Sequence, residues 1–168
     1  MSVSTGPFER IEAISEEHDL AGFDCGDPDF NDFIKNDALS DMRSHYSVTY
    51  VGLMDGRPVA YVSLVAAAYS AELLSGKDKA DFQYRHVPAL KIARIATDRS
   101  CQMRKCARTL LDFSFVVGMQ VRELCGCRLM VTDAIPDKIE WYERRGFTLS
   151  IKRDGKASRD NHPMYAIF

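Results

Sequence analysis

The stretch IARIATDRSCQMRKCARTLL, residues 92–111, contains the pattern that decides the fold of this chain. A short apolar run over 92–97 stops at Asp98, and a compact polar loop then leads into an amphipathic segment that opens around Lys105. This order predicts a strand that feeds a long helix through a tight loop. Such a unit points several backbone N–H groups at one spot, which suits a phosphate or a pyrophosphate.

The segment after Ala107 repeats apolar or small residues at helical spacing, with charged residues on the rest of the helical wheel. The apolar or small positions are Leu110, Leu111, Ser114, Gly118, Val121 and Cys125. We therefore expect an amphipathic helix that packs along this stripe.

The remaining elements follow from local start, stop and turn signals. Asp27-Pro28 places a capping carboxylate before a proline, as at a helix start, and Asp55-Gly56 between two β-rich runs predicts a hairpin. Gly146 is expected to follow the end of a short helix. The predicted strands are 8–14, 48–54, 57–68, 89–97, 128–132, 147–151 and 164–168, with a loop or short helix over 70–87, a short helix over 138–145 and a charged loop over 152–163.

The resulting order, β-α-β-β-β-α-β-α-β-β, predicts a mixed sheet with helices on its faces, an α/β (α+β) architecture. A length of 168 residues fits one domain over 1–168, because no repeat, low-complexity tract or linker divides the chain.

The composition is ordinary for a globular enzyme, with 46% hydrophobic residues, 27% charged residues and a net charge of −2. This charge argues against a dedicated nucleic-acid-binding domain, which usually carries a clear basic excess. We find no apolar signal core and no run of about 20 apolar residues, so we expect a soluble, cytoplasmic protein without membrane contact. The five cysteines show neither a disulfide framework nor the paired spacing of a zinc site, which predicts reduced thiols and no metal.

Several segments resemble the GCN5-related N-acetyltransferase (GNAT) family. The family's acetyl-CoA loop reads Gln/Arg-x-x-Gly-x-Gly/Ala, and residues 102–107, QMRKCA, are similar to it. Residues 93–98 resemble the strand that holds the pantetheine arm, and residues 141–147, WYERRGF, resemble the Phe-Tyr-Glu-x-x-Gly-Phe ending of the family. The segment 23–26 and the helix after it are similar to the branch that includes toxin-type acetyltransferases. The resemblance implies a mostly antiparallel sheet of about seven strands with helices on both faces.

The resemblance also implies a function, which is N-acetyl transfer from acetyl-CoA to an amine within a ternary complex. Tyr142 is then the general acid for the departing thiolate, since a phenol with a pKa near ~10 is protonated at neutral pH. The implied cofactor-binding residues are Ile95, Ala96 and Thr97 of the strand and Gln102, Met103, Arg104, Lys105, Cys106, Ala107 and Arg108 of the loop and helix start. The main contacts are expected from their backbone groups.

Two departures from the family pattern stand out. Lys105 occupies the first glycine position of the loop, and we expect it to adopt ordinary helical backbone angles at the helix start. Ile135 replaces the asparagine often found seven residues before the tyrosine. The first departure concerns the affinity for the cofactor, since a glycine lets the backbone come close to phosphate.

The acceptor and the general base are less clear. We expect a small-molecule or protein amine as the acceptor and place tRNA behind these, because the chain is slightly acidic and its basic cluster is modest. That cluster consists of Arg85, His86, Lys91 and Arg94. The candidates for the base are Glu72, Asp98, Asp133, Glu140 and water, and none is preferred.

Two alternative functions and the oligomeric state stay open. The alternatives are a non-catalytic module that binds CoA or a partner, and a toxin that acetylates aminoacyl-tRNA. Aromatic residues near the ends, Phe8, Tyr165 and Phe168, belong either to the core or to a homodimer interface.

Overall fold

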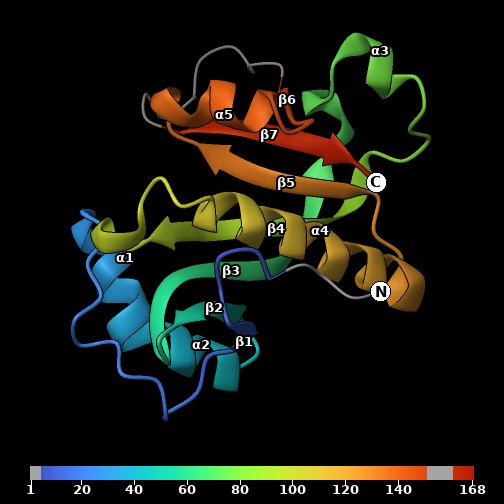
Figure 1. Cartoon of the computed structure of the whole chain (residues 1–168). Helices are drawn as coiled ribbons and strands as arrows, with labels where there is room; N and C mark the ends of the chain where they lie inside the picture. Colours follow the sequence, from blue (N-terminus) through green and yellow to red (C-terminus); the bar gives the residue numbers. More distant parts are fainter. Residues whose placement is uncertain (1–4, 151–160) are drawn as a thin grey trace. The chain divides into compact units, whose positions relative to one another are not determined.

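The computed structural model describes residues 5–150 and 161–168 and contains a seven-stranded sheet of mostly antiparallel strands (Figure 1). The strand order is β1-β2-β3-β4-β5-β7-β6. The strands are β1 (Arg10–Ala13), β2 (Val48–Met54), β3 (Arg57–Ser70), β4 (His86–Thr97), β5 (Leu129–Ala134), β6 (Thr148–Leu149) and β7 (His162–Ile167). The predicted fold class and the predicted order of the elements are confirmed.

The helices lie where the sequence predicts them, but their bounds differ from the predicted ones. The α-helices are α1 (Pro28–Asp32), α2 (Ala38–Arg43), α3 (Gly76–Lys79), α4 (Cys106–Cys125) and α5 (Ile139–Glu143). The π-helical turn η1 (Phe33–Asp37) joins α1 to α2, and the 3-10 turns are η2 (Ala71–Leu73), η3 (Arg99–Cys101) and η4 (Pro136–Lys138). None of the helices among the described residues has the length and apolar character that crossing a membrane requires.

The chain packs as two compact units, the first formed by 1–65 and 93–117 and the second by 66–92 and 118–168. The single domain over 1–168 stays a prediction.

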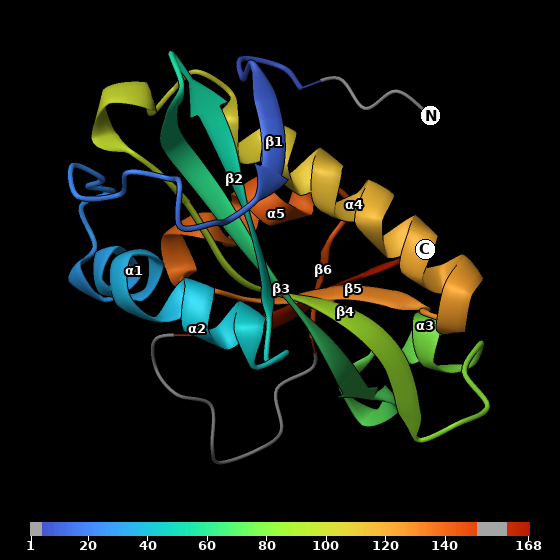
Figure 2. The same ribbon diagram turned by 90° about the horizontal axis from the view of Figure 1, so that it is seen from below.

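In the first unit, β2 pairs with both β1 and β3 in antiparallel fashion. Asp55 and Gly56 join β2 to β3 with φ angles of 51° and 70°, the two left-handed positions of a tight hairpin turn. The Asp27 carboxylate caps α1 by accepting the backbone N–H groups of Asp29 and Phe30, as the sequence predicts. Helix α2 lies against β2 (Figure 2). The buried side chains of this core are Ile14, Phe23, Phe33, Ile34, Ala38, Val51, Leu53 and Tyr61.

In the second unit, β4 and β5 are parallel, with partners that run from Ala89↔Leu129 to Ile92↔Thr132. Strand β7 pairs with both β5 and β6 in antiparallel fashion, and α5 lies next to β6 (Figure 1). The buried side chains of this core are Ala71, Leu74, Val87, Ala89, Leu129, Val131 and Tyr165.

The aromatic residues near the ends belong to the two cores. Phe8 and Tyr165 are buried, and the Phe168 ring packs closely on Gly118. The predicted strand over 147–151 is shorter in the structure, and Ile151 and most of the predicted charged loop lie outside the described residues.

Candidate functional site

The loop of the strand–loop–helix unit begins at Asp98, directly after β4 ends at Thr97. One Asp98 carboxylate oxygen accepts the backbone N–H of Ser100 at 2.9 Å, and the other accepts the N–H of Asp24 at 2.9 Å. Partial burial acts to raise the pKa of Asp98, but hydrogen bonds from Ser100 and from the Asp24 N–H bring this pKa below its ordinary value. Asp98 therefore holds the start of the loop as a charged carboxylate.

Gln102 anchors the next part of the loop. Its side-chain Nε2 donates to the carbonyl oxygens of Thr97 and Cys25, each at 3.3 Å. The amide thus joins the end of β4, its own loop and a turn 77 positions away in the sequence.

The middle of the loop has an unusual backbone. Met103 and Lys105 have φ angles of 71° and 62°, both in the left-handed region that favours glycine. The expectation that Lys105 takes ordinary helical angles is therefore wrong. The physical reason is that the loop turns into α4 through alternating backbone conformations, the kind of alternation found in anion-binding nests. The N–H of Arg104, between the two left-handed residues, donates to the Cys101 carbonyl at 3.3 Å. A glycine is relaxed at this position, whereas a lysine is strained there.

Helix α4 starts directly after this loop. The first backbone N–H bonded into the helix is that of Thr109, which donates to the Lys105 carbonyl at 2.9 Å. In the described part of the chain, the N–H groups of Cys106, Ala107 and Arg108 have no side-chain acceptor. The positive end of a 20-residue helix therefore presents free amides, which is the arrangement that binds phosphate groups.

The side chains of this loop and helix start differ in exposure. Met103 is fully exposed, and Arg108 is loosely paired with Asp112 at 3.9 Å. The Cys106 thiol is buried, which raises its pKa, and it donates to the Cys101 carbonyl at 3.6 Å. Cys106 therefore contributes its backbone to the helix start and its side chain to the core.

The end of β4 offers two further features. The parallel pairing with β5 stops at Ile92↔Thr132, while β4 continues to Thr97. The Thr97 hydroxyl is buried and has no hydrogen-bond partner among the described residues. A buried hydroxyl without a partner is unfavourable unless a ligand or water satisfies it. These features fit a polar arm laid along Ile95, Ala96 and Thr97.

Tyr142 lies in the second unit, on α5, and only 5% of its surface is exposed. Its ring packs at right angles to that of Trp141, with centroids 4.9 Å apart, and edge-on to that of Phe147. Burial raises the pKa of Tyr142, while a hydrogen bond with Thr132 acts to lower it. The phenol is therefore protonated at neutral pH.

The candidate bases and the basic cluster are mostly engaged in ion pairs. Glu72 pairs with Arg85 at 3.7 Å, and Glu140 pairs with Arg144 one turn further along the chain. Arg94 of the basic cluster stacks over the Phe33 ring at 4.1 Å. Three members of the basic cluster, Arg85, Lys91 and Arg94, thus each contact another side chain.

The cysteines and acidic residues do not form a metal centre in the described part of the chain, since three potential ligands never gather there. All five cysteines are free thiols, three of them buried and Cys125 exposed.

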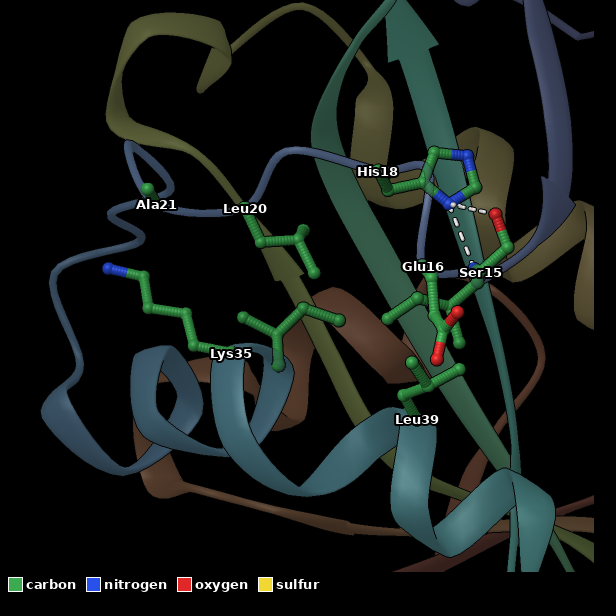
Figure 3. A pocket seen from close by; sticks show the side chains of 9 residues that line it. Ser15, Glu16, His18, Leu20, Ala21, Lys35 and Leu39 are labelled. Carbon is green, nitrogen blue, oxygen red and sulfur yellow. Dashed lines mark hydrogen bonds between the residues drawn. The ribbon is translucent and has the colours of Figure 1, made fainter.

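A cavity of about 450 Å³ lies in the first unit, between the segment 14–21 and the helical turns η1 and α2 (Figure 3). Figure 3 shows His18 beside Ser15 and Lys35 away from this pair. The His18 Nδ1 accepts the Ser15 N–H at 2.9 Å, and its Nε2 lies 2.9 Å from the Glu12 carboxylate. None of the predicted site residues lines this cavity.

Comparisons with known proteins identify a similar sequence and several similar structures. No protein-family model matches the chain. A tRNA-acetylating toxin of Mycobacterium tuberculosis (strain ATCC 25618 / H37Rv) is 26% identical over 131 residues, which cover 78% of each chain. A tyrosine-to-phenylalanine mutant of KacT superposes with a TM-score of 0.82 at 20% identity, covering 94% of each chain. AtaT complexed with acetyl-methionyl-tRNAfMet superposes with a TM-score of 0.81 at 21% identity and the same coverage.

The chain has the GNAT fold of the KacT and AtaT structures. The recognition from sequence is thus confirmed. A structure of AtaTR bound with AcCoA, with a TM-score of 0.74 and 20% identity over 94% of this chain and 92% of that one, agrees with an acetyltransferase that uses acetyl-CoA.

The prediction that placed tRNA behind other acceptors is wrong, because these GNAT relatives include a tRNA-acetylating toxin and a complex with acetylated tRNA. The error came from averaging the charge over the chain. Residues 9–43 hold 11 of the 24 acidic and only 3 of the 22 basic residues, so the rest of the chain carries 19 basic and 13 acidic residues. A net charge of −2 hides this basic excess.

Proposed function

We propose that this protein transfers the acetyl group of acetyl-CoA to the α-amino group of an aminoacyl-tRNA. The observation that carries the proposal is the loop at 103–105, with its left-handed Met103 and Lys105, followed by the start of the 20-residue helix α4, in a chain with the fold of the toxin-type acetyltransferases.

The cofactor part rests on backbone groups. The free amides of Cys106, Ala107 and Arg108 would hold the pyrophosphate, with help from the helix dipole and from cationic side chains at the same end. Arg104 and Lys105 are exposed and supply such charge. The unpartnered hydroxyl of Thr97 and the backbone of Ile95 and Ala96 would hold the pantetheine amides. Bound acetyl-CoA supplies the activated thioester.

The chemical part assigns the acid. The acceptor nitrogen attacks the thioester carbonyl, the C–S bond breaks, and the thiolate takes a proton. Tyr142 is suited to give this proton, because its burial raises the pKa and keeps the phenol protonated, and its ring is held by edge contacts with Trp141 and Phe147. A positioned acid contributes roughly 10²- to 10⁴-fold to such a step. The structural neighbours include tyrosine-to-phenylalanine mutants of both KacT and AtaT, which supports a functional role for a tyrosine here.

The acceptor part rests on the relatives and on charge. The tRNA-acetylating toxin is similar over 78% of this chain, and the basic excess outside 9–43 suits a phosphate backbone. AtaT has also been solved bound to the C-terminus of the antitoxin AtaR, which supports an antitoxin partner here. Expression should then arrest growth, and a neighbouring antitoxin should relieve the arrest.

A non-catalytic CoA-binding module is the alternative, and the strained Lys105 in the loop is the observation that favours it. Calorimetry with acetyl-CoA, followed by measurement of free thiol after addition of aminoacyl-tRNA, separates the two. Heat of binding together with thiol release supports the enzyme. Binding without release supports the module, and absence of binding overturns both.

A further inference from the structure

A second polar cluster lies in the second unit, on residues that the proposed chemistry does not yet use. It combines Tyr69 at the end of β3, Lys91 on β4, Asp133 on β5 and Ser150 after β6. The Lys91 Nζ lies 2.6 Å from one oxygen of Asp133, Oδ2. The Tyr69 hydroxyl is hydrogen-bonded to that of Ser150. Burial raises the pKa of Tyr69, and the hydrogen bond with Ser150 acts to lower it.

Among the described residues, one oxygen of the Asp133 carboxylate has a hydrogen-bond partner and the other has none. Lys91 contacts Oδ2, whereas Oδ1 accepts no hydrogen bond from the described residues. The side chains of Lys91 and Asp133 are 37% and 39% exposed, so a ligand can reach them. Because Oδ2 of this carboxylate already binds the ammonium group of Lys91, we expect its other oxygen to suit a second protonated amine.

The position of Asp133 along β5 connects it to the proposed acid. Its neighbour Thr132 is hydrogen-bonded with Tyr142 and is the last β5 residue with a parallel partner in β4. Successive side chains of a strand point to opposite faces, so Thr132 and Asp133 face opposite sides of β5. The acid and this carboxylate thus flank the strand at the point where its pairing with β4 stops.

The other carboxylates considered as bases are committed elsewhere. Asp98 caps η3 and accepts the Asp24 N–H. Glu140 pairs with Arg144 on the exposed side of α5. Glu72, in the turn η2, pairs with Arg85, which directly precedes β4.

We propose that Asp133 binds the α-ammonium group of the acceptor through Oδ1 and takes its proton, an inference that rests on the proposed function. The proton moves from the acceptor nitrogen to Asp133, and the freed lone pair attacks the acetyl carbonyl carbon. The C–S bond then breaks, and the thiolate takes the phenol proton of Tyr142. The nitrogen loses its second proton to the Tyr142 phenolate, and Asp133 releases the first proton to solvent, so that the products are the amide, the free thiol and one proton. No oxidant, reductant or further reactant is needed.

The test compares Asp133→Asn with two controls, using acetyl-CoA and aminoacyl-tRNA. Glu140→Gln removes a carboxylate of the same unit that also pairs with a cation. Lys91→Met breaks the same ion pair as Asp133→Asn but leaves the carboxylate in place. We expect Asp133→Asn to lower kcat/KM for the acceptor by at least about 10-fold. Glu140→Gln should stay within about threefold of wild type, Lys91→Met should lose less activity than Asp133→Asn, and the Kd for acetyl-CoA should be unchanged in all three.

The pH profile gives an independent readout. Without the carboxylate, only acceptor that is already deprotonated can react. The acidic limb of kcat/KM for Asp133→Asn should therefore move up toward the pKa of an α-amino group, about 8. In Asp133→Asn, the Lys91 ammonium loses its partner, which can destabilise the fold. The double variant Lys91→Met/Asp133→Asn removes both charges and avoids this effect. Its kcat/KM should fall as much as that of Asp133→Asn.

The possible results distinguish the role of Asp133 from the proposed function as a whole. If wild type transfers acetyl and Asp133→Asn matches Glu140→Gln, the role of Asp133 is overturned and the proposed function stands. If Asp133→Asn and Lys91→Met lose activity and thermal stability equally, the pair is structural and the inference fails. If wild type acetylates no aminoacyl-tRNA, the proposed function fails, and the inference fails with it.

Discussion

The rings of Tyr142 and Phe147 meet edge to face, with centroids 5.2 Å apart and an angle of 67° between their planes. The contact holds the Tyr142 ring in the core, while the hydroxyl reaches Thr132. Thr132 in turn donates to the Ile92 carbonyl at 3.2 Å. A side chain that is both packed and hydrogen-bonded in this way has a fixed position, as a proton donor requires.

The first prediction concerns the hydroxyl of Tyr142. Tyr142→Phe keeps the ring contacts and removes only the proton donor, so kcat should fall by roughly 10²- to 10⁴-fold. The free energy of unfolding should fall by only about 1 kcal/mol, the usual net value of one hydrogen bond. Tyr84→Phe, at an exposed tyrosine, is the matched control. Steady-state kinetics that leave kcat of Tyr142→Phe at the wild-type level would remove the proposed acid.

The second prediction concerns the strain at Lys105. Lys105→Gly should raise the free energy of unfolding by about 1 kcal/mol, because glycine has no Cβ that clashes in the left-handed conformation. For a chain of this size, that is roughly 2–4 °C in Tm. If the backbone amides supply most of the binding, the Kd for acetyl-CoA should change by less than about 10-fold. Arg104→Gly, between the two strained residues, should lower stability instead, and a gain there would contradict this account.

The third prediction concerns the close approach of Gly52 to Phe8. A Cβ on Gly52 would lie 2.6 Å from the Phe8 ring, so Gly52→Ala should cost about 1–3 kcal/mol through overpacking. Gly22 has no neighbour within 4 Å of the same position, so Gly22→Ala serves as the control. Urea unfolding monitored by circular dichroism measures both, and equal midpoints would show that Phe8 does not pack there.

The fourth prediction concerns pH. The pKa of Asp98 is lowered in the folded state, so its hydrogen bonds contribute stability above the unfolded value of about 3.9. This contribution is lost as the pH falls through the folded pKa. Asp98→Asn should therefore be less stable than wild type at pH 7 and more nearly equal to it at about pH 3.

The control for this pH dependence is Asp81→Asn, at an exposed aspartate whose carboxylate bonds to no described residue. Urea midpoints across the pH range should coincide for Asp81→Asn and wild type. A difference between Asp98→Asn and wild type that stays constant with pH would contradict the role of the Asp98 charge.

The parts of the fold that depend on neighbouring residues were readable from the sequence. The Asp27 cap and the Asp55-Gly56 turn are each fixed by two or three consecutive residues, and both are found as predicted. The amphipathic stripe of α4 is likewise local. The π-helical turn at 33–37 was not predicted, because its residues have ordinary helical propensities.

The parts of the site that depend on distant contacts were not readable in the same way. Lysine at position 105 is compatible with a helix start, and its left-handed backbone appears only once the loop is fixed at both ends. One end is fixed by Gln102, whose amide reaches the Cys25 carbonyl. The free oxygen of Asp133 likewise depends on where Lys91 lies on the neighbouring strand. The uneven charge of 9–43 was present in the sequence, but the net charge concealed it.

The most direct test of the central claim is to incubate the protein with radiolabelled acetyl-CoA and a pool of aminoacyl-tRNA, with deacylated tRNA in parallel. The account predicts label on the α-amino group of the aminoacyl-tRNA, none on deacylated tRNA, and almost none with Tyr142→Phe. Label that never reaches the aminoacyl-tRNA, although acetyl-CoA binds, would contradict it.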